Sequence, residues 1–182
     1  GLENLKGENA YTPTYDEFMA FSIMGKFTPM GAHDLYLFMK EHNDMFLLVD
    51  VGELSYDDTR AVYSEIVQSF ENDDAALSRL IVGGHTFEMI DAVKSVYDFS
   101  LFNLYYSGKI INESFDTADF ISYCENNGIQ SLSCAAAYFT PVSAEELSHS
   151  SLYKFVFTIN DENAAKAAFD LGADAVGTDE IK

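Results

Sequence analysis

The sequence predicts an α/β fold in which about six parallel strands alternate with helices, as in an incomplete TIM-type (β/α) barrel. Short apolar runs alternate with amphipathic stretches along the chain. The amphipathic stretches are about 10 to 15 residues long, which suits helices that connect parallel strands by right-handed crossovers. No G-x-G-x-x-G sequence follows any of the apolar runs, which disfavours a dinucleotide-binding sheet. A barrel is therefore the favoured form of the sheet.

The order of the elements follows from this alternation. Strands are expected at residues 45–51, 79–82, 101–106, 129–134, 154–159 and 173–177. Helices are expected at residues 33–39, 56–70, 87–97, 117–126, 143–147 and 161–171. Asp161 is placed to cap the last helix, and Gly128 and Gly172 are placed to end two of them. Residues 1–14 are polar and predict a tail or linker, so the barrel domain is expected to span residues 15–182.

Composition indicates one globular domain. The chain has 182 residues, of which 48% are apolar, and it contains 15 Phe and 11 Tyr but only 3 Pro. A chain of this length buries roughly two-thirds of the surface that it would expose when unfolded. Two separate domains would each be too small for a sizeable core.

The charge balance excludes some partners. Ten Lys and Arg face 30 Asp and Glu, which gives a formal net charge of -20. Such a surface repels nucleic acid and anionic membranes. A small phosphodiester would meet the same repulsion unless a divalent cation or a local basic cluster reversed the field. The alternative is that the acidic surface, of a kind common in bacterial proteins, only maintains solubility.

The two cysteines and the hydropathy of the chain give no evidence for a metal site, a disulfide or a location. Cys124 and Cys134 have no zinc-site or disulfide spacing and are interpreted as core residues. No apolar stretch approaches the roughly 20 residues that span a bilayer, and residues 1–11 contain no signal-peptide core. A leader or anchor removed upstream of Gly1 would leave no trace, so the sequence does not assign a location.

Two segments carry a family resemblance. The run FVFTINDE at 155–162, followed by LGADAVGTD at 171–179, is similar to the closing strand signatures of glycerophosphodiester phosphodiesterases. The segment GKFTP at 25–29 and the strand ending FLLVD at 46–50 resemble the lead-in to that family's metal-binding carboxylate. The resemblance runs from about Tyr15 to the C-terminus. It implies a phosphoric diester hydrolase of lipid metabolism, on a phospholipase C-like barrel.

The family's opening motifs are absent. H-R-G, E-x-D and the following H-D, which the family uses for catalysis and metal binding, do not occur in the sequence. The first two or three strands of the family barrel therefore have no counterpart, and the sequence is similar to an N-terminally truncated member. His33 and His42 lie on the expected lead-in helix and do not replace the missing histidines.

Catalytic groups of a (β/α) barrel lie at the carboxyl ends of its strands. The residues at those ends are Asp50, His85, Tyr106, Cys134 and Asn160.

The resemblance makes Asp50 an oxygen ligand of Ca²⁺ or Mg²⁺, and Glu53 is a nearby second carboxylate. The alternative for Asp50 is a loop anchor or helix cap. Two residues on, Gly52 replaces the lysine that the family commonly carries, which weakens phosphate binding.

The other candidates also have structural alternatives. His85 follows two glycines and is the one candidate for acid–base catalysis, with a helix-capping role as the alternative. Phe157 aligns with a family Trp that packs beneath the substrate, but it also suits the core. Asn160 is a candidate substrate-binding residue, or with Asp161 a helix cap. His149 and the serines around it show no nucleophile triad.

Two functions follow from these observations. One is a phosphodiesterase-like domain that is inactive without the missing strands, and the other is a degenerate barrel that binds a ligand or partner without catalysis. The first and last strands of an incomplete barrel lack partners, so unpaired backbone groups have to be covered. We expect the open edges to be covered by association of two chains, rather than by closure of the six strands or by residues 1–14.

Overall fold

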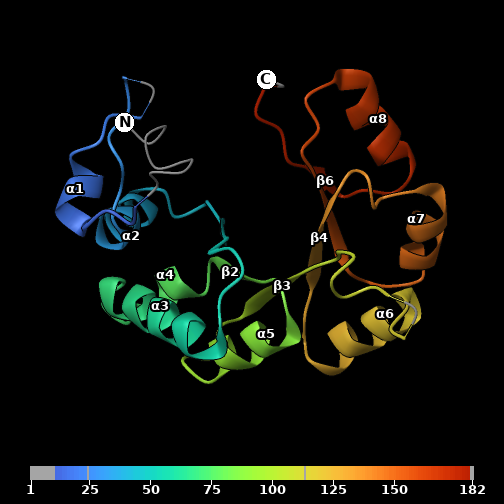
Figure 1. The fold of residues 1–182 in the computed structure, drawn as a ribbon, viewed down its shortest axis with the longest axis horizontal. Helices are drawn as coiled ribbons and strands as arrows, with labels where there is room; N and C mark the ends of the chain where they lie inside the picture. The colour runs from blue at the N-terminus through green and yellow to red at the C-terminus, as the bar shows by residue number, and fades with distance from the viewer. Residues whose placement is uncertain (1–10, 24, 113, 181–182) are drawn as a thin grey trace.

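The computed structural model describes residues 11–23, 25–112 and 114–180. In this part of the chain six strands form one sheet in sequence order (Figure 1). The strands are β1 Leu47–Val49, β2 Leu80–Gly84, β3 Leu101–Tyr105, β4 Ser131–Ala135, β5 Tyr153–Phe157 and β6 Ala175–Val176. The helices are α1 Tyr15–Met19, α2 Ala32–Glu41, α3 Tyr56–Ser69, α4 Asp74–Leu77, α5 Phe87–Lys94, α6 Thr117–Asn126, α7 Pro141–Ser148 and α8 Glu162–Asp170.

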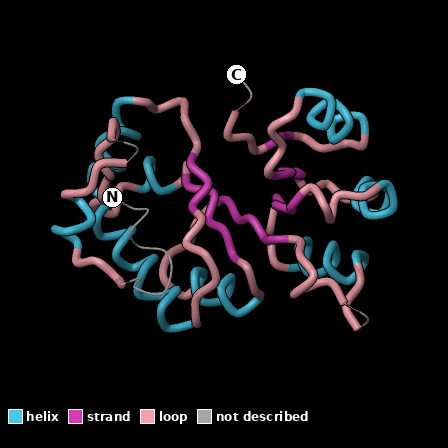
Figure 2. The backbone as a smooth tube through the Cα atoms, turned by 45° about the horizontal axis from the view of Figure 1, so that its top comes forward, coloured by secondary structure: helices cyan, strands magenta, loops and turns pink. Residues whose placement is uncertain are grey.

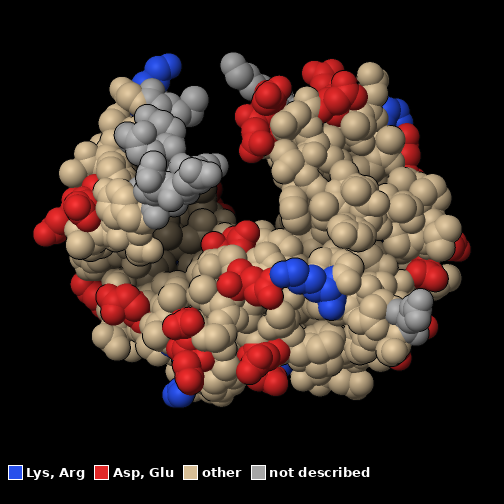
Figure 3. All heavy atoms as spheres, in the orientation of Figure 1, with Lys and Arg blue, Asp and Glu red and all other residues tan. Residues whose placement is uncertain are grey.

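All five neighbouring strand pairs are parallel, which confirms the prediction of an incomplete TIM-type barrel. The sheet curls, and the helices lie on its convex side (Figure 2). Within the described residues the sheet does not close, and β1 and β6 each pair with one strand only. The space-filling view shows the opening as a deep notch between the α1–α2 side and the α8 side (Figure 3).

The core lies between the sheet and its helices. Side chains of a strand alternate between the two faces of a sheet, so every second residue points to the helices. These residues are almost fully buried and include Leu80, Val82, Leu104, Leu132, Cys134 and Val156. Cys124 on α6 is also buried, which confirms that both cysteines are core residues. Burial raises the pKa of each thiol to about 12.

The concave face carries the other set of side chains and is less well filled. Toward the amino ends of the strands it contains a largely apolar cavity of about 410 Å³, whose lining includes Phe46, Ile81, Leu101, Ser131 and Phe155. Closer to the carboxyl ends lies Asn103, which is fully buried. Its Oδ1 accepts hydrogen bonds from the hydroxyls of Ser131 and Ser133 at 3.0 and 3.2 Å. Its Nδ2 has no partner among the described residues.

One arginine fixes the connection between α2 and β1. The Arg79 guanidinium donates to the carbonyl oxygens of His42 at 3.0 Å, Met45 at 3.3 Å and Met39 at 2.9 Å. The planar guanidinium group, with its five N–H donors, suits this role. The end of α2 and the start of β1 are therefore held to the residue that precedes β2.

Local signals explain most element boundaries. Asp161 caps α8, as predicted, by accepting from the Ala164 N–H at 2.9 Å. Helix α7 begins at Pro141, two residues before the predicted start, because Thr140 is its N-cap and proline suits the first helical turn. Helices α1 and α4 were not predicted, since runs of five and four residues leave no periodic signal. The predicted tail at 1–14 lies largely outside the described residues.

Candidate functional site

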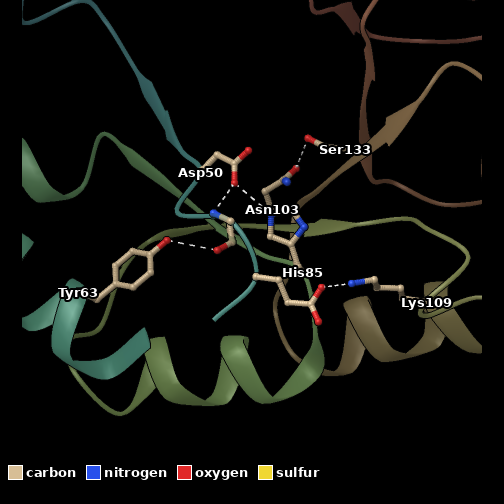
Figure 4. A network of polar contacts seen from close by, with 9 residues as sticks. Asp50, Tyr63, His85, Asn103, Lys109 and Ser133 are labelled. Atoms are coloured by element: carbon tan, nitrogen blue, oxygen red, sulfur yellow. Dashed lines mark hydrogen bonds and ion pairs between the residues drawn. The ribbon is translucent and has the colours of Figure 1, made fainter. Parts of the chain in front are cut away.

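Two residues that follow neighbouring strands meet at the carboxyl edge of the sheet. Asp50 directly follows β1, and His85 directly follows β2. Their side chains point toward one another, and Nε2 of His85 lies 3.0 Å from Oδ1 of Asp50 (Figure 4). The two residues are 35 positions apart in sequence, and the parallel pairing of β1 with β2 brings them together.

The Asp50 carboxylate accepts hydrogen bonds from several neighbouring groups. Besides His85, the Gly52 N–H donates to Oδ1 at 2.9 Å, and the Tyr105 hydroxyl also interacts with the carboxylate. Partial burial works against ionisation, but the hydrogen bonds from His85, Gly52 and Tyr105 outweigh it and lower the pKa of Asp50. An ionised carboxylate only accepts hydrogen bonds, so Nε2 of His85 carries the shared proton. Asp50 thus anchors its loop through the Gly52 N–H and contacts His85, and its role as a metal ligand stays a prediction.

His85 is packed as well as hydrogen-bonded. Its ring stacks on that of Tyr105 with centroids 3.9 Å apart and an interplanar angle of 11°. The His85 side chain is 25% exposed, and Nδ1, the other ring nitrogen, makes no hydrogen bond to a described residue. His85 does not cap α5, because Thr86 does so by accepting from the Met89 N–H. The imidazole is thus held by Asp50 and Tyr105 and stays partly exposed.

Tyr105 links the site to Phe157. The two rings contact edge to face at 5.9 Å and 73°, which brings Phe157 from the end of β5 next to the His85 stack. Burial and then the Asp50 carboxylate raise the pKa of Tyr105, so its phenol stays protonated. Phe157 accordingly lies beside the candidate site and is partly buried, and its role beneath a substrate stays a prediction.

A second charged pair borders the site. Lys109, in the loop after β3, forms an ion pair with Glu53, in the loop after β1 (Figure 4). Both side chains are exposed, and the ammonium group lowers the pKa of Glu53. Gly52 has a φ of +69°, a left-handed conformation in which a lysine would be strained. Lys109 therefore brings a positive charge to the loop after β1, where it is paired with Glu53.

The strands below the site approach closely. A Cβ on Gly83 would lie 2.8 Å from the Val49 carbonyl oxygen, so only glycine permits this spacing of β1 and β2. The Tyr63 hydroxyl on α3 donates to the Gly83 carbonyl at 3.2 Å and ties that helix to the end of β2 (Figure 4). Burial raises the pKa of Tyr63, which keeps this donor protonated. The end of β2, which leads into His85, is thereby held by β1 on one side and by helix α3 on the other.

Three of the predicted strand-end residues lie elsewhere. Tyr106 points toward the helices, because the two-residue alternation of a strand turns it away from the concave face, and Cys134 is the core residue that the sequence predicted. The Tyr106 hydroxyl instead lies 2.9 Å from that of Thr117 on α6. Asn160 does not cap α8. Its Oδ1 accepts from the Thr178 hydroxyl at 3.1 Å and the Asp179 N–H at 2.9 Å, which joins the loops after β5 and β6.

Sequence reasoning did not single out Tyr105, Lys109 or Tyr63. Tyr105 had a usable signal, since it lies at an even offset from Leu101 and so shares the concave face. Lys109 is one of only 10 basic residues in the chain and follows a strand end. Tyr63 had no signal, because its role depends on how α3 packs on the sheet.

No metal cluster or membrane helix is present among the described residues. No three His, Cys, Asp or Glu side chains in that part of the chain are grouped to hold a metal ion. None of its helices is both long and apolar enough to cross a bilayer. The predicted Ca²⁺ or Mg²⁺ ligands Asp50 and Glu53 lie on the same loop, each already paired with a side chain of the protein.

Comparison of the fold with solved structures finds clear similarity. A glycerophosphodiester phosphodiesterase from Parabacteroides distasonis matches with a TM-score of 0.73 over 96% of this chain and 70% of its own, at 13% identity. The fold is a partial glycerophosphodiester phosphodiesterase-type barrel. An Oleispira antarctica phosphodiesterase, in complex with the product sn-glycerol-3-phosphate, matches with a TM-score of 0.56 over 81% of this chain and 56% of its own, at 14% identity.

The similarity is one of structure. No protein-family model matches the sequence, and no curated protein matches it either. The chain spans 70% of the Parabacteroides distasonis chain and 56% of the Oleispira antarctica chain. The glycerophosphodiester phosphodiesterase-type barrel is thus shared over most of this chain, while part of each solved structure has no counterpart in it.

Proposed function

We propose that this chain is a phosphodiesterase-like domain that binds a small phosphate ester at the carboxyl ends of its strands and does not hydrolyse phosphodiesters by itself. The observation that carries the proposal is the site of Asp50, His85 and Tyr105 at that edge. Active sites of (β/α) barrels lie at this edge. The solved phosphodiesterase with bound sn-glycerol-3-phosphate supports a ligand of that class.

The groups around the site are better suited to bind a phosphate than the net charge of the whole chain suggests. Lys109 offers an ammonium group, and His85 offers a partly exposed imidazole. Asp50 and Glu53 would repel a phosphate if they were free, but each is paired with one of these two groups. Local pairing therefore offsets part of the repulsion from a chain of charge -20.

A non-catalytic binding or interaction domain is the second candidate. It is favoured by the use of the Asp50 carboxylate for internal hydrogen bonds and by Gly52 at the position of the family's lysine. With one accessible imidazole, the site offers one partner for proton transfer, whereas cleavage of a phosphodiester by general acid and base needs two. Neither candidate predicts turnover by this chain alone, and the two differ in whether the site binds a phosphate ester.

Hydrolysis is tested directly. The purified chain should hydrolyse glycerophosphodiesters no faster than buffer, with or without Ca²⁺ or Mg²⁺, because the site lacks a second imidazole and a set of metal ligands. The measurement is release of the alcohol product, with an established phosphodiesterase as positive control. Turnover well above background that disappears in His85→Ala would show that the chain is an enzyme.

Ligand binding is tested with sn-glycerol 3-phosphate itself. Titration followed by amide chemical shifts should perturb the residues around Gly52 and His85 and weaken at least fivefold in Lys109→Ala. Lys166→Ala is the matched control, since Lys166 is similarly exposed and is paired with Asp170 on α8. Equal effects of the two variants would mean that binding reflects general charge, and no binding would remove the proposed ligand class.

Metal binding should be weak. Asp50 and Glu53 supply two carboxylates, whereas Ca²⁺ prefers six to eight oxygen ligands. Calorimetry should therefore show millimolar affinity or none for Ca²⁺ and Mg²⁺. Micromolar binding that survives Asp50→Asn would place the metal site elsewhere in the protein.

A further inference from the structure

An ion pair between two loops crosses the carboxyl end of β2. Glu53 lies in the loop after β1 and Lys109 in the loop after β3, and β2 lies between these two strands. The pair therefore passes beside His85, which directly follows β2 (Figure 4). Lys109 lowers the pKa of the Glu53 carboxyl most, and His85 lowers it further. One carboxylate of the protein thus faces both basic groups of the candidate site.

This arrangement gives the Lys109 ammonium an anion of its own before any ligand arrives. An ammonium group has three N–H donors, so its geometry allows a second partner. A phosphate and the Glu53 carboxylate on the same ammonium group would repel one another, however, because both are negative. A phosphate ester therefore uses Lys109 fully only when Glu53 has moved away from it.

We propose that Glu53 competes with a phosphate ester for Lys109, so that this carboxylate limits the affinity of the site and favours doubly charged phosphate monoesters as ligands. The inference rests on the proposed function, because it concerns the same ligand at the same site. The side chains of Glu53 and Lys109 are 46% and 68% exposed, so no packing holds them together. An exposed ion pair contributes little to stability, and exchange of its anion is therefore easy.

The charge of the ligand decides whether the exchange is favourable. A phosphate monoester carries roughly 1.5 to 2 negative charges at pH 7, whereas a carboxylate carries one. A monoester therefore gives Lys109 a stronger partner than Glu53. A phosphodiester carries one negative charge, so replacing Glu53 with it gains little. The compound sn-glycerol 3-phosphate belongs to the first class, and its methyl ester belongs to the second.

Calorimetric titration of wild type and Glu53→Gln with sn-glycerol 3-phosphate tests the competition. Glutamine keeps the size of the side chain and removes its charge, so the dissociation constant should fall by about threefold. Asp170→Asn is the matched control, because it removes one charge from an exposed ion pair with Lys166 on α8, and its dissociation constant should equal that of wild type. Damage to the fold would weaken binding, so it does not imitate the expected gain.

Two further titrations separate competition for Lys109 from general repulsion by Glu53. In the Lys109→Ala background, Glu53→Gln should improve binding by less than about 1.5-fold, because no ammonium group remains to compete for. The methyl ester of sn-glycerol 3-phosphate should bind to wild type about fivefold more weakly than the monoester. Equal affinity for the two esters would overturn the preference for a doubly charged ligand.

The ion pair is also measured without a ligand, by carboxyl chemical shifts. The pKa of Glu53, which Lys109 lowers, should rise in Lys109→Ala. An unchanged pKa of Glu53, or equal affinities of wild type, Glu53→Gln and Asp170→Asn, would overturn the inference and leave the proposed function standing. An equal gain of affinity in both charge variants would overturn it as well. An intact ion pair with no binding to wild type or to Glu53→Gln would contradict the proposed function itself, and this inference with it.

Discussion

Asn103→Asp should destabilise the protein by about 3 kcal/mol at pH 7.5, with a smaller penalty of about 1 kcal/mol at pH 4.5. Asn103 is fully buried on β3, and its Oδ1 accepts from Ser131 and Ser133. An aspartate keeps the shape and both accepted hydrogen bonds but adds a charge that water cannot reach. Burial of a carboxyl commonly raises its pKa by several units.

The sign of the pH dependence follows from that raised pKa. A carboxyl that is neutral in the folded state and ionised in the unfolded state destabilises the fold once the pH exceeds its pKa in the unfolded state, about 3.9. The penalty grows until the pH passes the folded pKa. Urea unfolding of wild type and variant at each pH measures the difference, so that changes common to both proteins cancel.

Asn103→Leu is the matched control for the charge. Leucine has a similar volume, removes the unpartnered Nδ2 and cannot ionise, although the Ser133 hydroxyl loses its acceptor. Its effect on the free energy of unfolding should not change with pH. If Asn103→Asp were equally independent of pH, or cost less than about 1 kcal/mol at pH 7.5, the interior around Asn103 would have to be open to water.

The sheet could be predicted from the sequence because its signals are local. All six strands lie where apolar runs predicted them, although β1 and β6 are shorter than expected. The ends of these strands depend on pairing, since a residue is part of a strand only where it is hydrogen-bonded to a neighbouring strand. Residues 45, 46 and 173 belong to the predicted strands but lie at an open edge of the barrel, beyond the paired region.

The candidate site was predictable in location but not in detail. Asp50 and His85 were both placed at strand ends, and their register across β1 and β2 makes them neighbours. That Asp50 binds His85 depends on side-chain directions at the ends of two loops, which no local pattern encodes. The stacking of His85 on Tyr105 likewise depends on how the ends of β2 and β3 lie relative to one another.

The confusion between Tyr105 and Tyr106 shows how sensitive such predictions are. The two residues are adjacent at the end of β3, and their hydroxyls lie on opposite faces of the sheet, one at the Asp50 site and one at Thr117. A shift of one residue reverses every side chain of a strand. A register based on Asn103, whose amide had to find polar partners inside the barrel, would have assigned Tyr105 to the site.

Phe120→Ala should have a still larger effect, a loss of about 3 to 5 kcal/mol in the free energy of unfolding. Phe120 on α6 is fully buried and contacts the Tyr106 ring edge to face, with centroids 5.2 Å apart. Truncation removes apolar surface from the core and leaves a cavity between α6 and the sheet. The same change in Phe169→Ala, on α8, is the control, because that side chain is 49% exposed and should cost less than about 1 kcal/mol.

The comparison of these two variants tests which side of the sheet holds the fold together. Denaturant unfolding at one fixed protein concentration keeps any contribution from dimerisation equal in both. If the core between sheet and helices supplies the stability, Phe120→Ala lowers the midpoint strongly while the hydrogen bond between Asp50 and His85 persists until global unfolding. Similar losses in Phe120→Ala and Phe169→Ala would instead mean that α6 is loosely packed, and that stability resides on the concave face.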